Sequence, residues 1–373
     1  MKLGDIAREV KENEKNPLEA GLDRIVGLEH LDPEELKISR WGNVTDGTTF
    51  TRKFRAGQIL FGRRRAYQKK AALADFDGIC SGDITVIEAI PGKVVPELLP
   101  YIIQNDAFFE YAVNESAGSL SPRVKWKHLA EYEINLPDTD TQRKIAELMI
   151  AFDESIEEKK TIIHSLEAIK TNLLLPKNKV GVRMPFSKVF ELRRELIETT
   201  DENVKYIALE HIEPQTGKIL YSGKASDAVS IKSKFYESDI LFGKLRVYLR
   251  KYWLATYEGV CSTEILVLKC RDVCIPEYGF YIVQNEDFIN FAINNSFGTK
   301  MPRTSWERLS EYEIYLPDKN VQVDIVTRLK EIDNIIQGLR DSITALLTMK
   351  KVHLQKSVQT PNFRVYSLIL LFT

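Results

Sequence analysis

The spacing of hydrophobic and polar residues along the chain predicts a mixture of strands and helices. Short apolar or alternating stretches, bounded by turn residues, predict strands at 24–31, 58–62 and 84–90. A proline followed by a longer apolar-rich stretch predicts a helix over 96–115, since proline fits the first helical turn. Strands and helices follow one another without regular alternation, so we expect the α+β class.

Two longer helices are predicted from heptad patterns, in which apolar residues lie alternately four and three positions apart. One alternative is that each helix packs on its own domain. Two equal seams favour helices that pack on one another, antiparallel and about an approximate two-fold axis. The first seam contains Ile145, Met149, Phe152, Ile156, Ile163 and Leu166, interrupted by Lys159, and the second contains Ile325, Leu329, Ile332, Ile336, Leu339, Ile343 and Leu346.

The sequence repeats itself after about 180 residues, which indicates a tandem duplication. The matching segments include IVGLEHLDP at 25–33 with YIALEHIEP at 206–214, ILFG at 59–62 with ILFG at 240–243, and EYE at 131–133 with EYE at 311–313. The register holds with one gap over more than 100 residues, and it places a second copy of the first predicted helix at 276–295.

The repeat and the two seams together predict the domain organisation. We expect a globular domain at 1–140, a long spacer helix at 141–180, a second globular domain at 181–320, a second spacer helix at 321–358 and a C-terminal tail at 359–373. The tail has no counterpart in the first repeat, and we expect a loosely held terminus.

Composition limits the function without deciding it. The chain has 52 basic and 53 acidic residues, a net charge of −1, which argues against DNA binding driven by the whole surface. Local basic patches are not excluded. The N-terminus lacks a secretory signal and no apolar stretch reaches the roughly 20 residues of a membrane span, so we expect a cytoplasmic protein. The four cysteines are spaced unsuitably for a zinc site, and we expect no bound metal.

No catalytic constellation is recognisable. Gly243-Lys244 lacks the other glycine and the hydroxyl residue of a P-loop. His30 and His211 recur, each beside a glutamate, but adjacent residues of a strand point to opposite faces, which favours a structural role. No serine or cysteine nucleophile accompanies them at an interpretable spacing.

Positive charge is concentrated at the same place in both repeats. Residues 51–70 contain eight basic and no acidic residues (+8), and residues 232–251 contain six basic and two acidic residues (+4). Such a run alone is often a solvated surface strip, but its duplication favours contacts to DNA phosphates and base edges. The candidate residues, including cations after a Gly/Pro loop, are Arg63, Arg64, Arg65, Tyr67, Lys69, Lys70, Arg123, Lys125 and Lys127, and in the second repeat Lys244, Arg246, Tyr248, Arg250, Lys251, Lys300, Arg303 and Arg308. The alternative for Arg123 and Arg303 is that they cap local carbonyl groups.

Several short motifs of the first repeat recur in the same order, with departures, in the second, which has ESDIL at 237–241, GVCS at 259–262, Gly298-Thr299, and Leu316-Pro317 before Gln322. In the first repeat they are GQIL at 57–60, RRR at 63–65, GICS at 78–81, a Gly-Ser loop at 118–119, and Leu136-Pro137 followed by QRKIA at 142–146. Each motif is short, but their order, their duplication and the long helices that follow cover nearly the whole chain. In this combination the chain resembles the specificity subunits of type I restriction-modification systems.

The resemblance implies two target recognition domains, each reading one half of a bipartite DNA target, with the helices setting the gap. It also implies two docked methyltransferase subunits, and ATP-dependent restriction subunits in the full complex. S-adenosylmethionine, ATP and Mg²⁺ would belong to those partners, and this chain would be a non-catalytic subunit without cofactors of its own. The second basic block, Gly243–Arg246 in place of Gly62–Arg65, is weaker, which indicates unequal affinity of the two domains.

Two alternative functions stay open. One is a specificity chain of a related restriction enzyme whose partner fuses methylation and cleavage, which the identity of the neighbouring subunit would reveal. The other is a helical adaptor whose two domains bind ligands other than DNA, which predicts no retention on duplex DNA at moderate salt.

Overall fold

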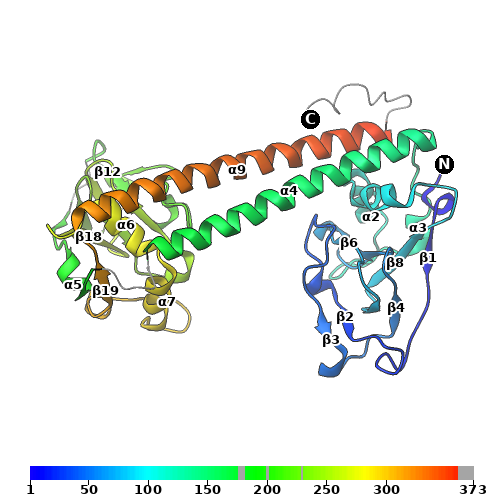
Figure 1. Cartoon of the computed structure of the whole chain (residues 1–373), viewed down its shortest axis with the longest axis horizontal. Coiled ribbons are helices and arrows are strands. Elements are labelled where there is room, and N and C mark those ends of the chain that lie inside the picture. Colours follow the sequence, from blue (N-terminus) through cyan, green and yellow to red (C-terminus); the bar gives the residue numbers. More distant parts are fainter. Residues whose placement is uncertain (175–180, 199–200, 228–229, 360–373) are drawn as a thin grey trace. The chain divides into compact units, whose positions relative to one another are not determined.

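The chain folds into two units, each of which contains segments of two long helices (Figure 1). The computed structural model describes residues 1–174, 181–198, 201–227 and 230–359. Unit 1 comprises Met1–Lys159 and the described residues from Asp341 onward, and unit 2 comprises Lys160–Arg340. The long helices are α4 (Thr139–Leu174) and α9 (Lys319–Gln359). The α+β class and the two long helices are confirmed, whereas the functional domain boundaries stay predictions. The predicted tail beyond 359 and positions 175–180 lie outside the described residues.

Two sheets form the globular part of unit 1. The first sheet is antiparallel and has the order β1 (Ala7–Val10), β8 (Ile84–Ala89), β5 (Ile59–Gly62), β6 (Ala71–Leu73). The second sheet has the order β3 (Gly42–Asn43), β2 (Arg24–Val26), β7 (Gly78–Cys80), β4 (Arg52–Phe54), and in it β2 and β7 are parallel. In β5, Ile59 and Phe61 pack toward the helices and Leu60 packs toward the second sheet. Because β5 is buried on both faces, its apolar run is unbroken.

Short helices cover the first sheet of unit 1: α1 (Leu99–Gln104), α2 (Asp106–Asn114) and α3 (Trp126–Leu129). The single helix predicted over 96–115 is therefore wrong. It breaks at Asn105, whose backbone is extended and whose side-chain oxygen accepts a hydrogen bond from the amide of Ala107 at 2.9 Å. Asparagine is a preferred N-cap residue, so it starts a new helix here instead of continuing the old one.

Unit 2 repeats this plan. Its first sheet has the order β10 (Phe190–Leu192), β18 (Ile265–Cys270), β15 (Ile240–Gly243), β16 (Tyr252–Leu254). Its second sheet has the order β11 (Leu196–Ile197), β14 (Lys232–Phe235), β17 (Gly259–Cys261), β12 (Lys205–Ile207), β13 (Gly223–Lys224). A further pair joins β9 (Val182–Pro185) to β19 (Glu313–Leu316). Its shorter helices are α5 (Phe186–Val189), α6 (Pro276–Gln284), α7 (Glu286–Asn294) and α8 (Trp306–Leu309). The break between α6 and α7 falls at Asn285, the counterpart of Asn105.

The strand predicted at 24–31 ends early, because residues 28–30 form a 3₁₀ turn. In this turn Nδ1 of His30 accepts a hydrogen bond from the amide of Gly27 at 2.9 Å. The counterpart His211 accepts from the amide of Ala208 at 3.1 Å. His30 and His211 therefore lie in turns and not in strands as predicted, and each histidine closes its turn.

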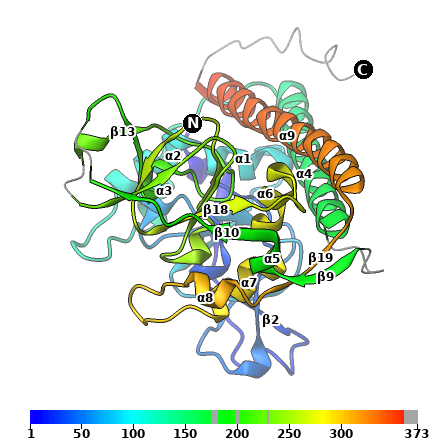
Figure 2. The same cartoon turned by 90° about the vertical axis from the view of Figure 1, so that its left-hand side faces the viewer.

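The two long helices lie side by side within each unit (Figure 1, Figure 2). In unit 1 the ring of Phe152 stacks with that of His353 at 6.3 Å between centroids. In unit 2 Arg340 donates to Glu167 at 3.1 Å, and the next pair along the helices joins Lys170 to Asp333. As the residue numbers along α4 increase, those of the contacting residues on α9 decrease, so the two helices pair antiparallel. Every residue of the two predicted seams is buried or half-buried.

Candidate nucleic-acid interface

The cationic segment of unit 1 forms a loop with unusual backbone geometry directly after β5. Tyr67 lies in a 3₁₀ helix (Ala66–Gln68) that is flanked by Arg65 and Lys69. Both flanking residues are left-handed, with φ of 55° and 52°. This conformation costs a non-glycine residue about 1–3 kcal/mol and is concentrated at functional sites. The loop presents Tyr67 with 55% of its surface exposed.

Unit 2 has the same loop after β15. Tyr248 lies in the 3₁₀ helix Val247–Leu249, and Arg246 and Arg250 flank it with φ of 52° each. Tyr248 is 50% exposed. The left-handed geometry thus occurs at equivalent positions of both repeats.

Some of the predicted cations hold this loop in place instead of facing solvent. In unit 1 Nζ of Lys69 lies 2.6 Å from the carboxylate of Asp106, which raises the pKa of Lys69, and Lys70 donates to the carbonyl oxygen of Leu28 at 2.6 Å. The counterparts in unit 2 do the same: Arg250 donates to Glu286 at 2.6 and 2.7 Å, and Lys251 donates to the carbonyl oxygen of Leu209 at 2.5 Å. These four residues are therefore loop anchors, a role that charge counting did not reveal.

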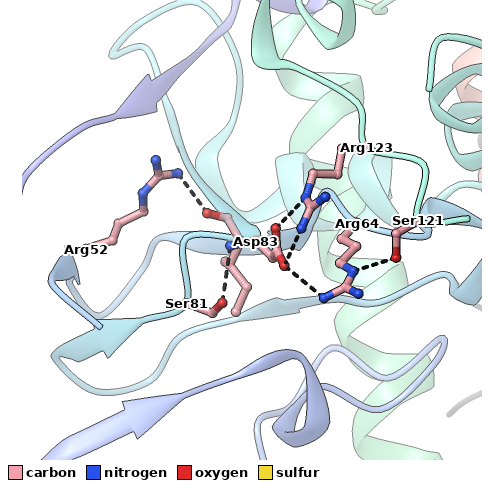
Figure 3. A network of polar contacts seen from close by, with 7 residues as sticks. Arg52, Arg64, Ser81, Asp83, Ser121 and Arg123 are labelled. Atoms are coloured by element: carbon pink, nitrogen blue, oxygen red, sulfur yellow. Dashed lines mark hydrogen bonds and ion pairs between the residues drawn. The ribbon is translucent and has the colours of Figure 1, made fainter. Parts of the chain in front are cut away.

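Two other predicted arginines converge on one carboxylate (Figure 3). Asp83 accepts hydrogen bonds from Nε and Nη2 of Arg123 at 2.7 and 3.3 Å, and from Nη1 of Arg64 at 3.4 Å. Nε of Arg64 donates to the hydroxyl of Ser121 at 2.9 Å. The hydrogen bond from Arg123, helped by its charge and that of Arg64, lowers the pKa of Asp83. The carboxylate offsets part of the positive charge and fixes both guanidinium groups.

Asp83 and Ser121 are not among the residues predicted from the sequence. A signal was present for Asp83, because an acidic residue recurs at the equivalent position of the second repeat, shortly after the Cys-Ser pair. That residue, Glu264, accepts a hydrogen bond from Nε of Arg303 at 2.9 Å. The arrangement of one acid beside the post-loop arginine is thus duplicated.

A closed loop projects beside these arginines in unit 1. Ala117 and Arg123 exchange two backbone hydrogen bonds of 3.0 Å, and Gly118 (φ 112°) allows the chain to turn. Leu120 lies in this loop with 91% of its surface exposed. A leucine this exposed beside a charged network is a candidate for contact with a partner molecule, and the sequence analysis did not identify it.

Unit 2 has the equivalent closed loop, in which Phe297 and Arg303 exchange hydrogen bonds of 2.8 and 2.9 Å. Lys300, which is exposed, occupies the position of Leu120. In both units this loop is joined to the cationic loop: the amide of Arg65 donates to the carbonyl oxygen of Pro122 at 2.8 Å, and that of Arg246 to Pro302 at 2.7 Å. Within each unit, the cationic loop and the closed loop are therefore joined by a backbone hydrogen bond into one surface.

Three guanidinium groups on this surface have donors without acceptors. The Nε atoms of Arg63, Arg65 and Arg246 are buried and have no hydrogen-bond partner among the described residues. An unsatisfied buried donor costs about 1–3 kcal/mol. Arg65 and Arg246 occupy equivalent positions, so the unsatisfied donor is duplicated as well.

The remaining predicted cations differ in their exposure and contacts. Lys244, which replaces Arg63 in unit 2, is half-buried, and its ammonium group makes no hydrogen bond or ion pair with the described residues. Arg308 lies over the ring of Phe297 at 5.2 Å. The other lysines of the predicted set, Lys125, Lys127 and Lys300, are exposed.

A polar groove of about 390 Å³ borders the Asp83 network in unit 1. Arg52 forms part of its wall and donates to the carbonyl oxygen of Ile84 at 2.7 Å (Figure 3). The groove is lined by Asn13, Thr49, Phe50, Thr51, Arg52, Ser81, Gly82 and Asp83. It extends the polar surface on the side away from Ser121.

Within the part of the chain that the structure describes, no group of three or more His, Cys, Asp or Glu side chains is arranged to hold a metal ion. Within the same residues, no helix combines the length and apolar character needed to cross a bilayer.

Comparison with known sequences and structures finds one family. The type I restriction modification DNA specificity domain matches residues 34–168 and 197–345. The chain is 30% identical over 152 residues to the EcoDI type I restriction enzyme specificity subunit of Escherichia coli, a match that covers 40% of this chain and 34% of that protein. The matched segment thus spans about a third of the length of this curated relative.

Solved structures give the same fold at low sequence identity. A chain from a structural study of complex assembly and conformational transition in the type I R-M system aligns with a TM-score of 0.59, 16% identity and 96% coverage of both chains. The type I restriction-modification system S subunit from M. genitalium aligns with a TM-score of 0.54, 14% identity, and 98% and 96% coverage. Since the family match spans most of the sequence in two copies, the chain belongs to the type I restriction-modification DNA specificity domain family.

Proposed function

We propose that this chain is the DNA-recognition subunit of a type I restriction-modification complex, in which each globular part reads one half of a bipartite target. The observation that carries the proposal is the duplicated cationic loop, in which Arg65 and Arg246 have left-handed backbone and precede an exposed tyrosine. Phosphate oxygens, and the O6 and N7 atoms of guanine, are the acceptors that guanidinium groups bind in DNA.

The proposed contact surface combines groups that no described side chain holds with groups that ion pairs or a ring contact fix in place. Arg63 and Arg65 would bind phosphate or base oxygens in one half-site, and Lys244 and Arg246 would do so in the other. Lys125, Lys127 and Lys300 would add phosphate contacts at the edge, and Tyr67 and Tyr248 would contact sugar or base. Arg64, Arg123, Arg303 and Arg308 would contribute from fixed positions, and the loop anchors would act by holding the backbone.

Two domains on a helical spacer suit the energetics of such recognition. One base pair supplies roughly 1–3 kcal/mol of discrimination, so a small domain that reads a few pairs selects poorly within a genome. Two half-sites combine their contributions, and a fixed gap between them adds a further requirement. In this proposal α4 and α9 set the gap, and the globular parts set the sequence.

The chemistry would belong to partner subunits. In this proposal the chain itself is non-catalytic, two methyltransferase subunits dock on it with S-adenosylmethionine, and restriction subunits join with ATP and Mg²⁺ in the cytoplasm. The family membership supports these assignments. A specificity chain with a partner that fuses methylation and cleavage would use the same surface and differ in the neighbouring subunit.

Sequencing of methylated sites would test the proposal. Cells that express this chain with its methyltransferase subunit should show one methylated motif made of two half-sites with a fixed gap. An Arg65→Gln and Arg246→Gln double variant should lose methylation, and an Asp75→Asn variant of an exposed acid serves as control. Methylation without a bipartite motif, or a chain that is not retained on duplex DNA at moderate salt, would favour the adaptor function.

A further inference from the structure

One cluster in unit 1 joins the globular part to both long helices. The hydroxyl of Tyr101, on α1, donates to Oδ2 of Asp153, on α4, at 2.9 Å. The ammonium group of Lys350, on α9, bonds the other oxygen of the same carboxylate. Lys350 also lies 5.0 Å from the centroid of the Tyr101 ring. Three segments far apart in sequence thus meet at one carboxylate.

Unit 2 contains the same cluster with the helices exchanged. The hydroxyl of Tyr281, on α6, donates to Asp333 at 2.7 Å, and this aspartate lies on α9. The lysine that completes the cluster is Lys170, on α4, which bonds the carboxylate of Asp333 and lies 5.8 Å from the ring of Tyr281. Each long helix therefore supplies the aspartate of one cluster and the lysine of the other.

The lysine of each cluster is better sheltered from solvent than the aspartate. In unit 1 the side chain of Lys350 is 14% exposed and that of Asp153 is 34% exposed, and in unit 2 the values for Lys170 and Asp333 are 22% and 40%. Burial, and then the neighbouring aspartate, raise the pKa of Tyr101 and of Tyr281, so both hydroxyls remain donors. Charge-assisted hydrogen bonds of this kind are about twice as strong as neutral ones, and partial burial limits their screening by salt.

The connectivity couples helix pairing to domain orientation. Asp153 alone could tie α1 to α4, but Lys350 reaches it from the second helix, so the full cluster forms only when α9 lies beside α4. A globular part that tilts on its helices must break at least one of these bonds. Ordinary helix packing through apolar side chains is less directional and would tolerate small tilts.

We propose that the two Tyr–Asp–Lys clusters are positioning elements that fix each recognition domain on the helix pair and so restrict the gap lengths that the protein accepts. This inference rests on the proposed function. One added base pair moves a half-site by about 3.4 Å and turns it by roughly a tenth of the helical repeat. A domain that is held rigidly on the helices cannot bind a half-site that has moved in this way. A domain that can tilt on the helices can still bind it.

The experiment measures methylation by the full chain in complex with its methyltransferase subunits. The substrates are duplexes with the two half-sites identified for the unaltered protein and with gaps changed by one or two base pairs. The variants are Tyr101→Phe and Tyr281→Phe, each of which removes one hydroxyl, and Asp153→Asn. The matched control is Glu167→Gln, which removes a helix–helix ion pair with Arg340 and leaves both clusters intact.

We expect the half-site sequences and the rate at the native gap to be kept in the tyrosine variants. Their discrimination against gaps one base pair longer or shorter should fall by about 3- to 10-fold, the value of one hydrogen bond. The discrimination against changed gaps should fall at least as far in Asp153→Asn. The Glu167→Gln variant should show the same dependence of methylation on gap length as the unaltered protein.

Three outcomes would overturn the inference, and they are distinguishable. Tyrosine variants with an unchanged gap profile would show that the clusters do not restrict the gap. An equal loss of rate at every gap would show a merely structural role. If the unaltered protein methylates no bipartite motif, the proposed function itself fails, and this inference fails with it.

Discussion

The carboxylate of Asp83 accepts hydrogen bonds from two nitrogen atoms of the Arg123 guanidinium group, at 2.7 and 3.3 Å. This pair places a negative charge within the proposed DNA-binding surface. Arg123 lowers the pKa of Asp83, so the carboxylate stays charged at neutral pH. The folded pKa lies below the unfolded one, and the pair therefore stabilises the fold above an ordinary carboxyl pKa of about 3.9 and loses this effect as the pH falls below it.

Replacing Asp83 with asparagine should strengthen binding to random-sequence duplex DNA and reduce preference for the correct target. The change removes one negative charge from the surface and frees Arg123 for a phosphate, which should steepen the salt dependence of binding by up to about 0.9. Salt-titrated fluorescence anisotropy measures this slope. Asp75→Asn removes an exposed charge from the same unit and is the control; unchanged or weaker random-duplex binding by Asp83→Asn would contradict the assignment.

Leu120 and Lys300 occupy equivalent positions of the two closed loops and should differ in the kind of contact they make. Leu120→Ala should weaken target binding by about 1 kcal/mol without changing the salt slope, because an apolar contact releases no counterions. Lys300→Ala should lower the slope by about 0.9. Dissociation constants at several salt concentrations separate the two effects, and a changed slope for Leu120→Ala would argue against apolar contact.

The cationic loop of unit 1 should contribute more affinity than that of unit 2. Arg63 carries a guanidinium group, which can bind a phosphate through two donors, whereas its unit 2 counterpart Lys244 carries a single ammonium group. Glutamine at Arg63 and Arg65 should therefore weaken binding more than glutamine at Lys244 and Arg246, and each lost phosphate contact should lower the salt slope by about 0.9.

Lys93→Gln removes a solvent-exposed cation of unit 1 and controls for net charge in this comparison. If the two double variants lost equal amounts of DNA-binding affinity, the prediction that unit 1 contributes more affinity than unit 2 would be wrong.

Gln142 should be important for stability, because it fastens the start of α4 to the globular part. Its side chain is buried, accepts from the amide of Val95 at 3.0 Å and donates to the carbonyl oxygen of Pro137 at 2.8 Å. Gln142→Ala should lower the free energy of unfolding by about 1–3 kcal/mol, since it leaves buried partners unsatisfied. Urea denaturation measures this, with the exposed Lys144→Ala as control.

The counterpart Gln322 makes three such bonds and is fully buried, so Gln322→Ala should cost more than Gln142→Ala. The opposite order would show that these bonds do not dominate the anchoring.

Cys80 should be unreactive in the folded protein. It is fully buried in β7, and burial raises the pKa of its thiol to about 12, so the reactive thiolate is scarce at pH 8. A thiol reagent such as DTNB should modify Cys80 only after unfolding, as located by peptide mass analysis. Labelling of Cys80 in the native protein at pH 8 would contradict this burial.

Local patterns in the sequence predicted the large features of this protein. The repeat was visible because both copies kept the same residues at the same spacing, and the long helices were visible because Ile325 and its heptad partners follow the period of a helix. The cationic loops were located for the same reason. Helix breaks were harder, because the cap at Asn105 outweighs a continuous apolar pattern.

Only the tertiary structure decided which groups act together. Charge counting treated Lys69 and Arg65 alike, yet Lys69 is tied to Asp106 and Arg65 has a free donor. The partners that make this difference are distant in sequence: Asp83 lies 40 residues from Arg123, and Asp153 lies 197 residues from Lys350. Sequence repeats and hydrophobic periodicity reflect residues that are close along the chain. The pairing of charges depends on which distant segments folding brings together.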